Sequence, residues 1–245
     1  MTETRRFVVA YDWIEALSSS AKIRLMNSLV AITSINVTRA SFSDSGDDGA
    51  KVHQIKSDEQ LQNKLEEFAE KELLVVEELV KGGSKLPRAT VSLLTRPSRR
   101  MIQVVGDERQ LNEEICLKIF QLIYRELAPI YGFSGIESGI NAFCFPWGSA
   151  TSDDHERLRR ATRLREGLVR KVHTEGKLHD VYDLNLLTGV HEQLFVGPLN
   201  LVQWSEQHPG TKSMDLGNGG KLWIVPSSQR AACRDYLVER GLLFP

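Results

Sequence analysis

The sequence predicts an α+β protein, with antiparallel or mixed sheets, long amphipathic helices and two lobes that either share a core or pack as separate units. Three observations lead to this class. Apolar residues recur at helical spacing in several long segments, β-rich runs flank turn residues in pairs, and no regular β-α-β alternation is visible. At 245 residues, 41% of them hydrophobic, the chain is long enough to bury a sizeable core.

An N-terminal lobe is expected to span residues 1–130 and to contain three helices and a hairpin. Asp12 and Asp107 each precede a Glu or Gln at the spacing of a capping box, which satisfies free backbone N–H groups at a helix start. Two β-rich runs flank the turn-rich stretch Arg-Pro-Ser-Arg-Arg, and this pattern predicts a hairpin. The predicted elements are helices 12–33, 58–81 and 107–130 and the hairpin 88–105.

Residues 131–150, YGFSGIESGINAFCFPWGSA, are rich in glycine and aromatic side chains and follow neither a helical nor a strand period. They are predicted to form a connecting loop between the lobes. Loops of this length without secondary structure are uncommon inside a compact domain, and those that occur are often functional. The segment is therefore expected to act as a lid, a linker or an interface.

A C-terminal α+β lobe is expected over residues 151–245. Its first helix begins with acidic residues and continues with basic ones, an order that the helix dipole favours. Asn218 followed by Gly219 is a strong hairpin signal, because both residue types tolerate the positive φ angles of a type I′ turn. The predicted elements are helix 153–173, strand 178–187, a short helix near 199–207, a hairpin turn at 218–219 and a final helix from 227 to 240.

The net charge and the number and spacing of the cysteines limit the classes of protein that fit this sequence. The formal net charge of −1 argues against a protein whose whole surface attracts polyanions. Three widely spaced cysteines without a CxxC motif are typical of a reducing compartment, so a cytoplasmic location is expected. No stretch approaches 18 consecutive apolar residues, and the apolar run after the N-terminus is too short for a signal peptide. No association with a membrane is expected.

No sequence motif predicts a cofactor or a metal ion. The glycines of GNGGK at 217–221 lack the spacing and the hydroxyl residue of a P-loop, and a hairpin turn explains them. His155 and His191 each begin an HExxH-like pattern, but neither pattern has the second histidine that a zinc site needs. Catalytic groups assembled from distant positions stay open, because such sites are recognised by geometry and not by sequence order.

The stretch KLHDVYDLNLL at 177–187 is the densest group of chemistry-bearing side chains in the sequence. As a helix it would bring His179 and Asp183 face to face, but its leucines would then point in all directions. As a strand it has one apolar and one polar face, so its period favours a strand. At about 3.3 Å per residue, a strand holds His179 and Asp183 roughly 13 Å apart, whereas Asp183 and Asn185 remain neighbours. A site here needs a partner from another element.

Helix 153–173 has seven arginines or lysines and four acidic residues. At about 100° per residue, three of its arginines lie opposite the apolar stripe. One interpretation is a solvated helix face with ion pairs between successive turns. The other is a docking face for an acidic partner or for phosphate, extended by two arginines of the predicted hairpin. The predicted binding residues are Arg159, Arg163, Arg170, Arg99 and Arg100.

Three hypotheses about function follow. The first, favoured by the lack of any catalytic or cofactor signature, is a non-catalytic protein that binds a protein partner, as an immunity protein or a cytoplasmic adaptor does. The second is a hydrolase or transferase with its site at the lobe junction, around the 131–150 loop and strand 178–187. The third and weakest is a phosphate or RNA binder that uses the basic helix 153–173, without the interleaved aromatics typical of RNA-binding sheets. The candidate catalytic residues are His179, Asp183, Asn185 and Cys144.

Overall fold

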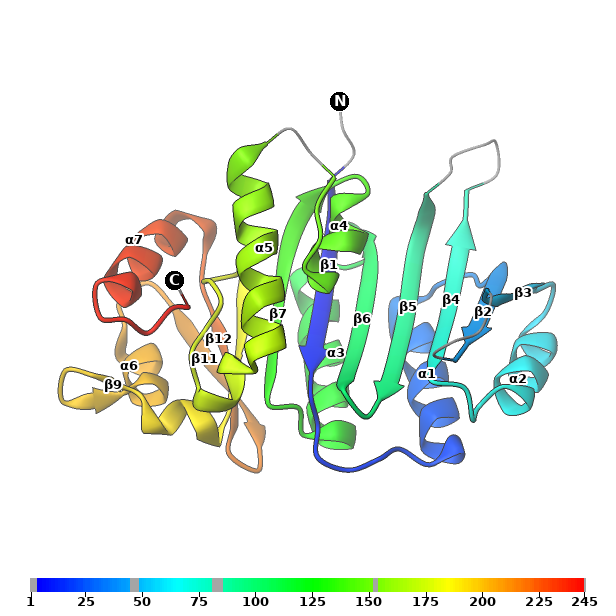
Figure 1. Ribbon diagram of the computed structural model, residues 1–245, viewed down its shortest axis with the longest axis horizontal. Coiled ribbons are helices and arrows are strands. Elements are labelled where there is room, and N and C mark those ends of the chain that lie inside the picture. Colours follow the sequence, from blue (N-terminus) through cyan, green and yellow to red (C-terminus); the bar gives the residue numbers. More distant parts are fainter. Residues whose placement is uncertain (1–3, 45–48, 81–85, 152–153, 245) are drawn as a thin grey trace.

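The computed structural model describes residues 4–44, 49–80, 86–151 and 154–244. Within these residues, one ten-stranded sheet runs through the molecule, and helices lie on both of its faces (Figure 1). A second, small sheet has two strands. The architecture is mixed α and β, as predicted, and the large sheet is its main element.

The first strand of the chain lies in the middle of the large sheet. The strand order is β11-β12-β8-β7-β1-β6-β5-β4-β2-β3, with every neighbouring pair antiparallel. The strands are β1 (Thr4–Tyr11), β2 (Arg39–Ser43), β3 (Lys51–Gln54), β4 (Leu73–Leu79), β5 (Pro87–Arg96), β6 (Arg99–Asp107), β7 (Tyr131–Ser138), β8 (Leu184–Leu187), β11 (Lys212–Gly217) and β12 (Gly220–Ile224). The small sheet pairs β9 (Phe195–Val196) with β10 (Leu199–Asn200).

Each face of the large sheet packs against its own set of helices. One face meets α1 (Ser19–Thr33), α2 (Asp58–Glu67) and α3 (Glu113–Leu127). The other face is covered by α4 (Asn141–Cys144), η1 (Phe145–Trp147), α5 (His155–Arg170), α6 (Leu201–Gln207) and α7 (Ser227–Val238). In Figure 1, α5 stands in front of the sheet and α3 behind it. Like η1, the segments η2 (Val172–Glu175) and η3 (Gly189–Gln193) are 3₁₀ helices.

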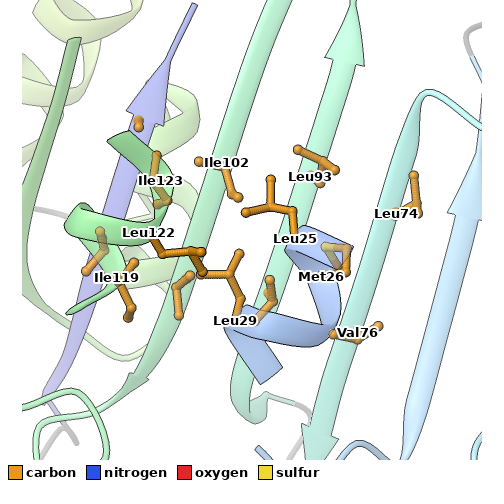
Figure 2. Close-up of a cluster of buried hydrophobic side chains, with 14 of the residues drawn as sticks. Leu25, Met26, Leu29, Leu74, Val76, Leu93, Ile102, Ile119, Leu122 and Ile123 are labelled. Carbon is orange, nitrogen blue, oxygen red and sulfur yellow. The ribbon is translucent and has the colours of Figure 1, made fainter. Parts of the chain in front are cut away.

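The core under α1 and α3 shows how the alternation of strand side chains produces this layering. Figure 2 shows residues of both helices directed at residues of β4, β5 and β6. Leu29 of α1 and Ile102 of β6 are completely buried there. In β1, Val8 belongs to this core and the next residue, Val9, to the core on the other face. The central strands β8, β7, β1, β6 and β5 thus have two buried faces over most of their length.

Both predicted hairpins are confirmed. Strands β5 and β6 pair antiparallel, with Arg96 opposite Arg99 at the turn. Strands β11 and β12 meet at Asn218 and Gly219, whose φ angles of 49° and 81° are those that a type I′ turn requires. The short helix α6 and the final helix α7 also lie where the sequence predicts them.

The prediction of one helix over residues 58–81 is wrong for its second half. Helix α2 ends at Glu67, and β4 begins at Leu73 between β2 and β5. Leu74 and Val76 are buried, whereas the residues between them are half-buried, which is the alternation of a strand. A run rich in leucine and valine fits both periods over a few residues, and pairing with two neighbouring strands decides between them.

The predicted starts of the other two N-terminal helices, 12–33 and 107–130, are too early. Helix α1 begins at Ser19, because Ser18 supplies the N-cap and accepts a hydrogen bond from a backbone N–H of the first turn. Helix α3 begins after Asn112, which caps it in the same way, while Asp107 closes a turn at the end of β6. A residue of a type that caps helices does precede each helix. Several such polar residues lie close together, however, and the capping-box spacing selected the wrong one.

Residues 131–150 are not a connecting loop. Strand β7 occupies 131–138 and pairs with β1 along its length, followed by the short helices α4 and η1. Its glycines allow close packing: a Cβ on Gly132 would lie 2.9 Å from the backbone oxygen of Val9. Glycine is rare in a central strand, so the residues that permit this packing also made the segment resemble a loop.

Strands from all three predicted segments join the large sheet. Strands β8, β11 and β12 come from residues 151–245, β7 comes from 131–150, and the others come from 1–130. The sheet is therefore shared, which is one of the two arrangements that the sequence left open. The division into two lobes stays a prediction.

Candidate functional site

Ion pairs on its inner side hold α5 against the sheet. Arg157 Nε lies 2.9 Å from Oε2 of Glu137, near the end of β7, and Arg160 Nε lies 3.1 Å from Oδ2 of Asp180. Both carboxylate side chains are only 6% exposed. A carboxylate removed from water needs a cationic partner to remain charged, so these two arginines are occupied within the fold.

Asp180 is the junction of this ion-pair network. Arg234 of α7 places its Nε 3.2 Å from Oδ1 of Asp180, opposite Arg160. The guanidinium of Arg160 also lies over the rings of Phe145 and Tyr182, 5.2 and 5.9 Å from their centroids. In the sequence, Asp180 is the single charge on the otherwise apolar face of the predicted strand 178–187. Its contacts explain why a charge is buried there.

Six further cationic side chains lie on the outer side of α5 or beside it, and they differ from Arg157 and Arg160 in their surroundings. Four of them are exposed and two are half-buried. No carboxylate in the described parts of the chain forms an ion pair with any of them. We call this group the outer basic surface, and its members are Arg99, Arg159, Arg163, Arg165, Arg170 and Lys171. The first residue of the predicted helix 153–173 lies outside the described residues, and the helix itself begins at His155.

Arg99 and Arg100, predicted together as binding residues, lie in different surroundings. Arg100 donates from Nη1 to the backbone oxygens of Trp13 and Ile14, the latter at 2.6 Å, so its guanidinium fixes the segment after β1. Arg99 lies over the indole of Trp147, 5.4 Å from the ring centroid, on the α5 side of the sheet. Arg99 therefore belongs to the outer basic surface, and Arg100 has a structural role.

A cavity of about 310 Å³ opens between the end of α5 and the β5–β6 turn. Arg99 comes from the turn, and Arg165 and Lys171 come from the last turns of the helix. The stem of Arg165 packs on Gly148, where an added Cβ would lie 2.5 Å from the Cβ of Arg165. The rest of the lining is Tyr11, Asp12, Ser98, Leu168 and Val169.

Among the described residues that line the cavity, Asp12 is the single carboxylate, and it is already engaged. Its Oδ2 lies 2.8 Å from Nε2 of the buried His173, and its Oδ1 accepts the backbone N–H of Arg100. Burial acts to raise the pKa of Asp12, but the hydrogen bonds from His173 and Arg100 outweigh it and hold that pKa below its usual range. Asp12 thus remains a carboxylate whose charge acts on Lys171, but it forms no ion pair with any of the three cations.

The predicted strand 178–187 is confirmed only over its last four residues, as β8. Leu178 forms an isolated bridge with Leu243. The chain from 179 to 183 then crosses the sheet face that α5 covers, without strand pairing. Asn185 is buried and bonds through its side chain to the backbone N–H and C=O of Tyr182. This local turn breaks the alternation that the sequence suggests, because a side-chain amide satisfies backbone groups that a ladder would otherwise pair.

Asp183 lies in a second cavity, of about 300 Å³, away from His179. Its carboxylate lies 2.9 Å from Nη1 of Arg230 and 3.5 Å from Nη1 of Arg6. Burial raises the pKa of Asp183, and the two guanidinium groups offset part of that effect. Neither His191 nor Cys144 lines this cavity. The structure thus pairs Asp183 with two arginines, and Glu113 and Lys212 line the same cavity.

His179 is buried against α5, and neither ring nitrogen has a hydrogen-bond partner among the described residues. Its ring lies 5.0 Å from that of Tyr131 in an edge arrangement. Burial, with the neighbouring His173 acting in the same direction, lowers the pKa of His179 to about 3. The imidazole is therefore neutral at pH 7 and packs as an aromatic core residue.

Gly167→Ala is expected to destabilise the protein by about 2 kcal/mol, although alanine favours a helix over glycine. The added Cβ would lie 2.0 Å from Cε1 of His179, so α5 or the imidazole must shift. Urea unfolding measures the effect. Combining it with His179→Ala should give a smaller loss than the sum of the two single losses, because the new methyl then occupies vacated space. Additive losses would argue against this contact.

Cys144 ends the short helix α4 and is partly exposed. Burial raises the pKa of its thiol, so the thiolate that a nucleophile requires is disfavoured. All three cysteines, Cys116, Cys144 and Cys233, are free. Within the described residues, no group of histidine, cysteine and acidic side chains could hold a metal ion. No helix among them is long and apolar enough to cross a bilayer.

Of the four charged residues that line the cavity, the sequence predicted only Arg99 as a binding residue and missed Arg165, Lys171 and Asp12. At about 100° per residue, Arg165 falls at the edge of the apolar stripe, between Val172 and Leu158, so a helical projection does not group it with the outer arginines. Asp12 was assigned to a helix cap, and its pairing with His173 joins positions 161 residues apart. The signal for Asp12 and Lys171 is their place directly after β1 and α5, which becomes informative once the sheet order is known.

The sequence matches no model of a known protein family and no curated protein. Among solved structures, its fold is similar to that of Pseudomonas aeruginosa T6SS protein PA0821, with a TM-score of 0.64 and 11% sequence identity. The match covers 98% of this chain and 73% of the other. At this identity the likeness is one of fold, and this chain shares the fold of a T6SS protein.

Proposed function

We propose that this chain is a non-catalytic protein that binds an acidic protein partner through the outer basic surface, as an immunity protein or an adaptor does. The observation that carries the proposal is the division of the α5 arginines. Arg157 and Arg160 on the inner side are paired with buried carboxylates, whereas the outer cations have no ion pair among the described residues. Arginine is enriched at protein interfaces, where its guanidinium group can bind one carboxylate through two parallel hydrogen bonds.

Two further findings support the proposal. The fold is similar to that of a protein described as belonging to the T6SS of Pseudomonas aeruginosa, so a role in such a system fits this chain as well. The candidate catalytic residues His179 and Asn185 are buried in packing roles, and Asp183 is held by two arginines. A cytoplasmic location belongs to the same proposal, which the free thiols support.

The triple variant Arg159→Glu/Arg163→Glu/Arg170→Glu tests this proposal. None of the three replaced side chains forms an ion pair in the described chain, so the melting temperature should change little. Six units of charge are removed, from −1 to −7. Affinity purification from the native host, followed by calorimetry with the purified partner, should show binding weakened on the order of 100-fold or more, since like charges then face each other across the interface.

A matched control has the same net charge. Arg24→Glu/Lys56→Glu/Arg109→Glu reverses three exposed cations of other elements and should keep the affinity of the unaltered protein within about twofold. Failure to recover a stoichiometric partner, or equal recovery with the two triple variants, would contradict the proposal. Recovery of nucleic acid with an affinity that falls steeply between about 50 and about 200 mM salt would replace the protein partner by a polyanion.

A further inference from the structure

We propose that the cavity between the end of α5 and the β5–β6 turn binds an aspartate or glutamate side chain of the protein partner. This inference deepens the proposed function and rests on it. The outer basic surface attracts an acidic protein, and the cavity is the place within that surface where one carboxylate can be held by several groups at once. The remaining outer cations then act mainly in steering the encounter.

The three cations of the cavity come from two elements that pack against each other. Arg99 lies on the β5–β6 turn, and Arg165 and Lys171 lie at the end of α5, on the near side of the sheet in Figure 1. Lys171 ends the helix in the left-handed conformation, with φ of 54°. The close approach of Gly148 to Arg165 ties η1 to α5 at this point. The cations are thus set by backbone positions that the fold holds in place.

The charge of the lining favours an anion. Three cations face one carboxylate, that of Asp12, whose oxygens are engaged by His173 and by the backbone N–H of Arg100. Arg99 is held over Trp147 and donates through Nη2 to the backbone oxygen of Pro146 at 3.5 Å, while its buried Nε has no hydrogen-bond partner among the described residues. A buried donor without an acceptor is destabilising, and a bound carboxylate would supply the acceptor.

The size and apolar part of the cavity favour a side-chain carboxylate over a larger group. A volume of about 310 Å³ lies at the lower end of the range for ligand pockets, roughly 300 to 1,000 Å³. Leu168 and Val169 contribute apolar surface, and Val169 is 77% exposed, which is unusual for a valine on a helix surrounded by charges. An acidic side chain matches this lining, with its methylene groups on Val169 and its oxygens on the cations.

Trp147 makes the inference testable, because its indole lies on Arg99. A blocked hexaglutamate peptide, titrated into the full chain at about 50 mM salt, is expected to change the Trp147 fluorescence, and a blocked hexaglutamine peptide is not. The Trp147→Phe variant assigns the signal to this indole. Arg165→Gln and Lys171→Asn should each weaken peptide binding about tenfold, the effect of losing one charge-assisted hydrogen bond. Asparagine tolerates the left-handed conformation of Lys171, so the helix end is kept.

Arg109→Gln, at an exposed position outside the cavity and the outer basic surface, is the control and should weaken binding less than about twofold. Equal weakening by Arg109→Gln and Arg165→Gln, or no change in Trp147 fluorescence, would overturn the cavity as a specific site. Inorganic phosphate that binds more tightly than hexaglutamate would overturn the carboxylate assignment. If the native partner is lost with the Arg159/Arg163/Arg170 reversal but is unaffected by Arg165→Gln, the cavity inference fails alone. If hexaglutamate binds as expected but no protein partner exists, the proposed function fails.

Discussion

Arg160→Ala is expected to lower the free energy of unfolding by about 3 kcal/mol, the scale of breaking a buried ion pair by removing one partner. Arg160 reaches both Asp180 and Glu137, whose carboxylate side chains are each 6% exposed. Without it, each carboxylate keeps one arginine, so the loss lies at the lower end of the range for buried pairs. The contacts of the guanidinium with Phe145 and Tyr182 are lost as well.

The neighbouring residue provides the control for this experiment. Arg159 lies on the same helix, is exposed and forms no ion pair in the described chain, so Arg159→Ala should change stability by less than about 0.5 kcal/mol. Urea unfolding followed by circular dichroism measures both variants. A loss for Arg160→Ala no larger than that for Arg159→Ala would show that the network is solvated and contributes little.

Lowering the pH from 7 to 4.5 is expected to reduce the free energy of unfolding by about 5 kcal/mol through two buried histidines. Burial lowers the pKa of His179 to about 3 and that of His191 to about 4. In the unfolded chain a histidine has a pKa of about 6.5. The loss is a large part of the 5–15 kcal/mol by which domains are stable, so acid unfolding is expected in this range.

The sign follows from which state binds protons first. Because the folded-state pKa values lie below the unfolded value, the unfolded chain takes up protons as the pH falls below about 6.5, and the folded chain does not. Stability is therefore highest above that pH and declines until the folded values near 4 and 3 are reached. The lowered pKa of Asp12 adds a loss at lower pH, whereas the raised pKa of Asp183 opposes it, because its protonation relieves a buried charge.

His191→Asn isolates one of the two histidines. The Nδ1 of His191 accepts the backbone N–H of Thr188 at 2.9 Å, and the Oδ1 of asparagine can accept the same hydrogen bond without titrating. The slope of stability against pH below about pH 6 should fall from about 2.7 to about 1.4 kcal/mol per pH unit. An unchanged slope in the His191 variant would show that His191 does not titrate as a buried group.

Short sequence patterns predicted the structure correctly where the residues concerned favour one local conformation. Asn218 and Gly219 predict a type I′ turn because few other residues tolerate the required φ angles, and the turn lies there. The amphipathic helix with its acidic start and basic continuation predicts α5, because its pattern persists over many turns. The outward side of that helix also follows from the spacing of Arg159, Arg163 and Arg170.

Local signals failed where pairing with distant strands decided the structure. Residues 73–79 fit a helix or a strand, and β2 and β5 select the strand. The glycines of 131–138 suggest a loop, and the close approach of β1 explains them. In the 177–187 stretch, the amide of Asn185 bonds to the backbone of Tyr182 and ends the alternation that the sequence suggests.

The sequence by itself determined the α+β class, both hairpins, the course of α5 and the basic character of its outer side, because each depends on residues close together in the chain. Only the tertiary structure decided which arginines are free to bind. Arg157 and Arg160 differ from Arg159 and Arg163 in no property of their residue type. They differ because Glu137 and Asp180, brought beneath the helix by the sheet and the segment after α5, pair with the first two and leave the others facing solvent. The charge of a side chain is local, but the partner that neutralises it is placed by the fold.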